Sequence, residues 1–180
     1  MGLRSLILGF SLFASAIVPE VSVADAPGQD GSAMHTQLPD AELIGRADIR
    51  ALGFRLYTTS LYAPDPAPFD WTYPFALHLD YNRGFSQSLL VGATMFELER
   101  LEGPQDDHRE IETALRTCFQ DVTAQDAYSA LAPESGRLRF FLNDQKTCEL
   151  AHPNISERLL GIWLSDEARS PALSRQLRGK

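Results

Sequence analysis

The chain has 180 residues and a formal net charge of −8, and it carries no basic cluster. This acidic balance argues against nucleic acid or an anionic membrane as the partner. The length suits a single domain with a substantial core.

The first residues are typical of a secretory signal peptide. Arg4 precedes an apolar run, Leu6 to Val18, whose 13 positions are too few to cross a bilayer, which takes roughly 20 residues. The small residues Ser22 and Ala24 place cleavage after Ala24. We therefore expect a signal peptide over 1–24, a periplasmic or secreted protein, and no transmembrane segment after cleavage, with an uncleaved anchor as the alternative. Residues 25–40 have little apolar content and predict a flexible lead before a domain over 41–180.

The first half of that domain is extended. Residues 43–50 and 53–62 read as two strands joined at Ala51-Leu52-Gly53, and the proline-rich segment "PDPAPFD" follows them. In "YPFALHLDYN" one parity is apolar and the other is polar or small, which predicts a strand with one face in a core.

The pattern then changes to a helical period. A helix is expected after Ser86 and a second after Asp106 or Asp107, followed by short strands in "DAYSALA", "RLRFFL" and "KTCELAH". Two further helices are expected after Asn154 and Ser170. Hairpins without βαβ alternation predict an α+β fold, an antiparallel sheet covered on one face by helices.

The sequence has only two cysteines, Cys118 and Cys148. In an exported chain they can form a disulfide that closes a loop of about 30 residues. Two separate buried thiols are the alternative. No GxSxG, P-loop, GxGxxG or HExxH pattern occurs, and the histidines lack a second ligand type at metal-binding spacing. We therefore expect no metal and no cofactor.

Three arginines, Arg46, Arg50 and Arg55, lie in or beside the first two strands. An arginine that faces an apolar pocket can hold a carboxylate or phenolate through two hydrogen bonds. Alternatively, the stem lies along the sheet and the charged head reaches water, which we favour for Arg50 and Arg55.

The segments "IGRADIRALGFRLYTTSLYAP", "FFLN" and "LLGIWLS" together resemble the chalcone isomerase-like proteins, in particular their exported bacterial branch. The resemblance runs from about Leu43 to the C-terminus and implies an open-faced β-sandwich. In catalytic members an arginine lies twelve residues before a threonine, and Arg46 and Thr58 have this spacing. The other catalytic positions, a tyrosine, an asparagine and a serine or threonine, are replaced here by Phe85 and residues near Gly92 and Gly161.

This substitution pattern favours a non-catalytic protein that binds a fatty acid or similar amphipathic acid, as the non-catalytic plant members of the resembled family do. Arg46 would pair with the acid group, assisted by Thr58 and by Tyr57 or Tyr62. An isomerase or lyase acting on another substrate, and a structural or partner-binding protein of the cell envelope, are the alternatives.

Overall fold

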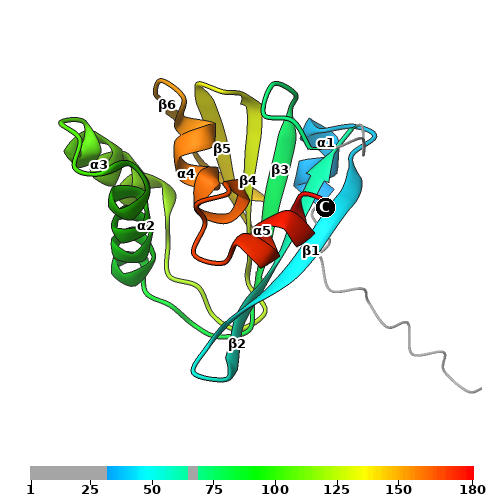
Figure 1. Cartoon of the computed structure of the whole chain (residues 1–180), viewed down its shortest axis with the longest axis horizontal. Coiled ribbons are helices and arrows are strands. Elements are labelled where there is room, and N and C mark those ends of the chain that lie inside the picture. The colour runs from blue at the N-terminus through cyan, green and yellow to red at the C-terminus, as the bar shows by residue number, and fades with distance from the viewer. Residues whose placement is uncertain (1–31, 65–68) are drawn as a thin grey trace, which may run out of the picture.

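The computed structural model describes residues 32–64 and 69–180. Within them six strands form one antiparallel sheet in which each strand pairs with its neighbour in sequence (Figure 1). The strands are β1 (Glu42–Ala51), β2 (Phe54–Ala63), β3 (Phe75–Tyr81), β4 (Ala127–Glu134), β5 (Arg137–Leu142) and β6 (Gln145–Ala151). The expected signal peptide lies outside the described residues.

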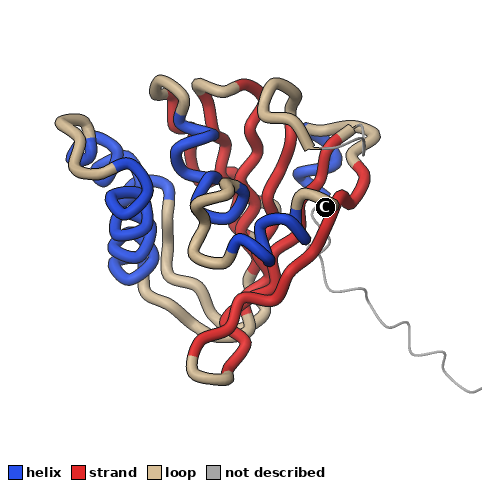
Figure 2. Tube along the Cα trace, viewed as in Figure 1, coloured by secondary structure: helices blue, strands red, loops and turns tan. Residues whose placement is uncertain are grey.

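In the described part of the chain five helices accompany the sheet (Figure 2). They are α1 (Ser32–Gln37), α2 (Gln87–Glu102), α3 (His108–Cys118), α4 (Ile155–Leu164) and α5 (Pro171–Leu177). Helices α2 to α5 pack against one face of the sheet, and their apolar side chains share one core with the residues of that face. The predicted α+β class, with helices over one face of an antiparallel sheet, is confirmed.

Local sequence explains where the helices begin. Ser86 caps α2 by accepting a hydrogen bond from the backbone N–H of Leu89 at 3.3 Å, as predicted. Pro171 occupies the first turn of α5, where its missing N–H leaves no bond unmade. Asp107 stands at the N-cap position of α3 but makes no capping bond, because its carboxylate binds Arg158 instead.

The predicted disulfide between Cys118 and Cys148 is confirmed, with the two Cα atoms 4.9 Å apart. It joins the end of α3 to β6. The pair α2–α3 is therefore fixed covalently to the far edge of the sheet.

Part of the expected flexible lead is structured. Helix α1 is followed by Leu38, which is buried against Ala76, Leu131 and Phe141 on the sheet face opposite α2 to α5. Leu38 is the one large aliphatic residue in the second half of that lead, so the low apolar content of the segment gives little sign of this packing.

Helix α5 closes the other end of the domain against β1. The side-chain amide of Gln176 donates to the backbone carbonyl of Arg46 at 2.6 Å. At Gly45 the backbones come so close that an added Cβ would lie 2.3 Å from the carbonyl oxygen of Gln176. None of the helices within 32–64 and 69–180 combines the length and apolar character needed to span a bilayer.

Candidate ligand-binding site

A cavity of about 160 Å³ lies between the sheet and helices α2 and α4, and it opens to the surface. Its wall is almost entirely apolar because the inward parity of β3 and β4 meets the apolar stripes of both helices. The apolar lining residues include Leu77, Leu79, Leu90, Phe119, Phe140, Leu159, Leu160, Ile162 and Trp163. Ala93 lines the cavity and is also exposed, so it lies at the opening.

Three tyrosines, Tyr57, Tyr81 and Tyr128, are among the residues that line the cavity. Burial raises the pKa of Tyr57 to about 12, and the negative charge of Glu97 adds to this rise. The hydrogen bond that Trp163 Nε1 donates to the Tyr57 hydroxyl at 3.0 Å acts in the opposite direction and lowers the pKa. Burial likewise raises the pKa of Tyr81 and of Tyr128. All three hydroxyls are therefore neutral at pH 7, and each keeps an O–H that can donate a hydrogen bond.

Tyr81 is the most available of these donors. Its ring lies 5.6 Å from that of Tyr57, and within the described residues its hydroxyl makes no hydrogen bond. By contrast, the Tyr128 hydroxyl donates to the backbone carbonyl of Cys118 at 3.5 Å while it accepts from the backbone N–H of Gln120 at 2.8 Å.

One charged residue lines the cavity within the described part of the chain: Glu97 of α2. Burial opposes its charge, but hydrogen bonds from Arg169 and Arg100 outweigh burial and hold the pKa of Glu97 below its usual value. Arg100 Nε donates at 2.8 Å, and so does Arg169 Nε. One carboxylate and two guanidinium groups leave this cluster with a net charge of +1.

Of the four ligand-binding residues expected from the sequence, Tyr57 alone lines the cavity. Arg46, Thr58 and Tyr62 have the opposite strand parity and lie on the other sheet face. The Arg46 side chain is 60% exposed and lies 3.6 Å from Asp80.

The other two residues also have local partners on that face. Thr58 donates to the carboxylate of Asp48 at 2.9 Å. The Tyr62 ring contacts that of His35, with the two centroids 6.0 Å apart. The structure therefore does not bring the four expected residues together.

A row of serine, histidine and aspartate crosses that same face. His78 Nδ1 lies 2.8 Å from Ser129 Oγ, and His78 Nε2 lies 3.1 Å from Asp80 Oδ1. Ser129 is only 3% exposed, whereas the carboxylate of Asp80 reaches the surface. A hydrolase needs the opposite arrangement, with the nucleophile at the surface and the carboxylate buried behind it. We therefore interpret the row as a satisfied polar ladder between β3 and β4.

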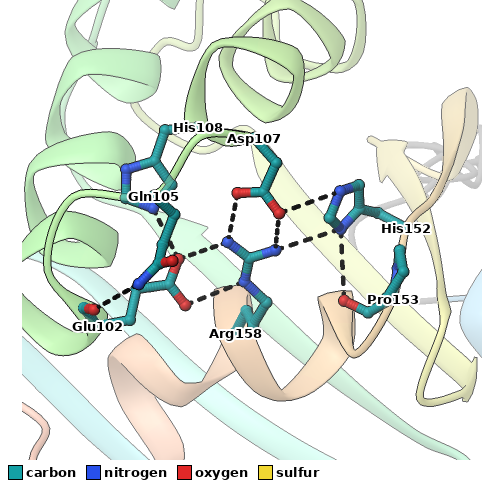
Figure 3. Close-up of polar contacts among 7 residues, drawn as sticks. All are labelled: Glu102, Gln105, Asp107, His108, His152, Pro153 and Arg158. Carbon is teal, nitrogen blue, oxygen red and sulfur yellow. Dashed lines mark hydrogen bonds and ion pairs between the residues drawn. The ribbon is translucent and has the colours of Figure 1, made fainter.

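An ionic cluster centred on Arg158 holds the helices together beside the cavity (Figure 3). The guanidinium binds Glu102, the final residue of α2, and Asp107, which precedes α3. His108 contacts Glu102 at 2.7 Å, and His152 contacts Asp107 at 3.3 Å. The hydrogen bond from Arg158 is the main reason that the pKa of Asp107 lies below its ordinary value.

The sequence matches no protein-family model and no curated protein. The structure is similar to that of a fatty-acid binding protein from Arabidopsis thaliana, AtFAP1, with a TM-score of 0.61 at 9% sequence identity. The match covers 78% of this chain and 88% of the plant protein. The fold is chalcone isomerase-like.

Arg46 and Thr58 are twelve residues apart, and so are their neighbours Ala47 and Thr59. Ala47 and Thr59 are directly paired across β1 and β2, and both are buried on the helix-covered face. Because strand side chains alternate between faces, Arg46 and Thr58 cannot share that face. On the helix-covered face the first residue of such a pair is therefore Ala47, which carries no charge.

The sequence did not single out Tyr81 and Glu97, which line the cavity, or Arg169, which pairs with Glu97. Tyr81 could have been found, since it shares the apolar parity of Leu77 and Leu79 in β3. Glu97 and Arg169 are 72 positions apart, and nothing in the sequence indicates that they pair.

Proposed function

We propose that this protein binds a fatty acid or similar amphipathic acid, with the apolar part in the cavity between the sheet and helices α2 and α4. The observation that carries the proposal is the apolar, surface-open cavity beside a cluster of net positive charge. The plant structure of the same fold is a fatty-acid binding protein, which supports this choice of ligand class.

The acid group is placed at the opening, against Arg169. This side chain is largely exposed and holds Glu97 through Nε and Nη2, and Nη1 has no hydrogen-bond partner among residues 32–64 and 69–180, so it can bind a second carboxylate. Charge-assisted hydrogen bonds of this kind are about twice as strong as neutral ones. The anchoring arginine of this proposal is therefore Arg169, supported by Arg100.

The size of the cavity limits how much of a ligand it can enclose. A volume of about 160 Å³ accommodates an apolar group of roughly the size of benzene. Only a segment of a long acyl chain would therefore fit inside, and the rest would lie outside the cavity, along the surface near Ala93. Tyr81 inside would donate to a ligand oxygen only where the ligand carries a second polar group.

We further propose that the protein works in the periplasm or outside the cell. The N-terminal pattern of Arg4, an apolar run and small residues supports export. The Cys118–Cys148 disulfide is consistent with an oxidising compartment.

Native mass spectrometry of the purified protein, followed by thermal titration with saturated acids of increasing chain length, tests the proposal. We expect a co-purifying acid and a rise in melting temperature on adding free acid, since ligands stabilise the state that they bind. Ala93→Trp should close the opening and abolish both effects, while Ala172→Trp, a matched change at an exposed alanine of α5, should preserve them. A clean mass and no thermal shift with any acid would refute the proposal.

The position of the acid group is tested separately. Arg169→Gln should weaken the acid but not the corresponding alcohol, because only the acid uses the charge. Arg46→Gln should leave both affinities unchanged. Loss of acid binding in the Arg46 variant, with Arg169→Gln silent, would move the anchor to the opposite sheet face.

A further inference from the structure

The β1–β2 hairpin ends in a tight turn with an apolar side chain at its tip. Ala51 pairs with Phe54, so Leu52 and Gly53 form the two-residue turn. Both have positive φ, 49° and 80°, as in a type I′ turn, for which Asn-Gly is the favoured sequence. Leucine disfavours this conformation, and its side chain is 96% exposed. Leu52 is therefore poorly suited to the turn and gains no burial in return.

A second apolar side chain lies next to it. Phe54 is 56% exposed, and its ring is contacted by the guanidinium of Arg83 at 4.3 Å from the centroid. The hairpin projects beyond the rest of the domain (Figure 2). Leu52 and Phe54 thus form an exposed apolar tip.

The tip is surrounded by cations. Arg50, Arg55 and Arg83 flank it, and Asp48 contacts two of them, Arg50 at 3.3 Å and Arg55 at 3.6 Å. Three guanidinium groups and one carboxylate give the hairpin end a net charge of +2, in a chain whose net charge is −8. The acidic composition of the whole chain argues against an anionic surface as partner, but the hairpin end has the opposite sign of charge.

We propose that the hairpin tip docks on an anionic phospholipid bilayer, with Leu52 and Phe54 in the interface and the arginines on the phosphates. Two apolar side chains ringed by cations have the composition of interfacial membrane anchors. They are too few for a stable protein interface, which buries about 800 Å² on each partner. The inference rests on the hairpin alone and is independent of the proposed ligand.

Docking in this way would bring the cavity close to the bilayer. Tyr57 lines the cavity and follows Phe54 by three residues in β2. At about 3.3 Å per residue, this is a distance of about 10 Å along the strand.

A fluorophore at the tip gives a local measurement. Both native cysteines are bridged, so Leu52→Cys takes an environment-sensitive label at one position. We expect its emission to shift to the blue with vesicles of equal parts phosphatidylglycerol and phosphatidylcholine, and not with phosphatidylcholine alone. Tyr73→Cys is the matched control, since Tyr73 is 67% exposed and precedes β3 at the far end of the sheet. Its label should not respond.

Binding of the unlabelled chain is measured by flotation with the same vesicles. Leu52→Asn removes the apolar tip while supplying the residue that the turn prefers, so we expect an unchanged or higher melting temperature and about tenfold weaker partitioning. Tyr73→Asn should partition like the parent. Raising the salt from about 0.05 M to about 0.5 M should release the parent chain, because it screens the arginines.

Three results would overturn the inference. The first is equal partitioning of Leu52→Asn and the parent chain, and the second is a silent label at position 52 on vesicle-bound protein. The third is a defined protein partner that Leu52→Asn fails to bind while neither chain binds vesicles, which would assign the tip to a protein contact.

Discussion

Arg158 and Glu102 form a two-point ion pair, with Nε 3.0 Å from Oε2 and Nη2 2.6 Å from Oε1, between α4 and the end of α2 (Figure 3). The same guanidinium holds Asp107 on the other side of the α2–α3 turn. One side chain of α4 therefore fixes both ends of that turn and keeps α2 over the cavity.

Replacing Arg158 with methionine should lower the free energy of unfolding by about 2–3 kcal/mol. Removing one partner of a buried pair costs about 3–5 kcal/mol, and this pair is partly screened because it reaches solvent. Urea denaturation measures the change. Arg116→Met breaks an exposed ion pair with Glu112 on α3 and should cost about 0.5 kcal/mol. Equal losses in the two variants would show that Arg158 has no special role.

The double variant Cys118→Ala/Cys148→Ala should be less stable than the parent by about 3–4 kcal/mol. The bond closes a loop with a sequence separation of 30 residues, and opening it releases chain entropy in the unfolded state. Guanidinium denaturation with and without a reductant checks this value. The reductant should destabilise the parent and leave the double variant unchanged, whereas an effect on both would mean that it acts elsewhere.

Two glycine-to-alanine changes should have opposite effects. Gly45→Ala should destabilise by about 2 kcal/mol or more, because the new methyl group would overlap the carbonyl groups of Gln176 and Leu177. Gly92→Ala meets no atom within 4 Å and should stabilise α2 by about 0.5–1 kcal/mol. Thermal unfolding of both variants tests the pair. A stable Gly45→Ala protein would contradict the close approach of β1 and α5.

Acid should weaken the outer edge of the sheet through Glu149. Hydrogen bonds from Arg137, Arg139 and Lys146 lower the pKa of this carboxyl from 4.5 to about 2. A carboxyl whose pKa is lower in the folded protein than in the unfolded chain stabilises the fold at any pH above about 4.5. This stabilisation is lost as the pH falls from about 4.5 towards 2.

The stability gap between the parent and Glu149→Gln should therefore be widest above pH 4.5 and close as the pH falls towards 2. Denaturation curves across that range measure it. Glu99→Gln is the control, since Glu99 has no ion pair in the described part of the chain. A gap that does not vary with pH would rule out the charge as its cause.

The fold class could be predicted because it depends on local sequence patterns. Alternation in "YPFALHLDYN" and helical spacing after Ser86 are properties of neighbouring residues, and strands and helices formed there. Helix α1 was not predicted because the contacts of its segment are with distant parts of the chain: Leu38, just after the helix, packs in a cluster with Phe141, and Gln37 accepts a hydrogen bond from Arg139.

The site was much less predictable, because strand alternation makes every assignment sensitive to a shift of one residue. The spacing of twelve fits both Arg46–Thr58 and Ala47–Thr59, and β1 has an irregular register between Leu43 and Gly45 that no local pattern indicates. The charged group nearest the cavity, Glu97, belongs to a helix and is paired from a distant segment.

Gln176 and Arg46, which form a side-chain to carbonyl hydrogen bond, are 130 positions apart in the sequence. In the sheet, by contrast, each strand pairs with the next strand along the chain. The hairpins within β1–β2–β3 and within β4–β5–β6 can form from local contacts, whereas the pairing of β3 with β4 must bridge α2 and α3, and β1 meets α5 only when the end of the chain arrives. Contacts between such distant segments are the slow ones in folding. Until then the outer edge of β1 can template pairing with a second chain. We therefore expect the packing of α5 against β1 to reduce pairing of this edge strand with a second chain.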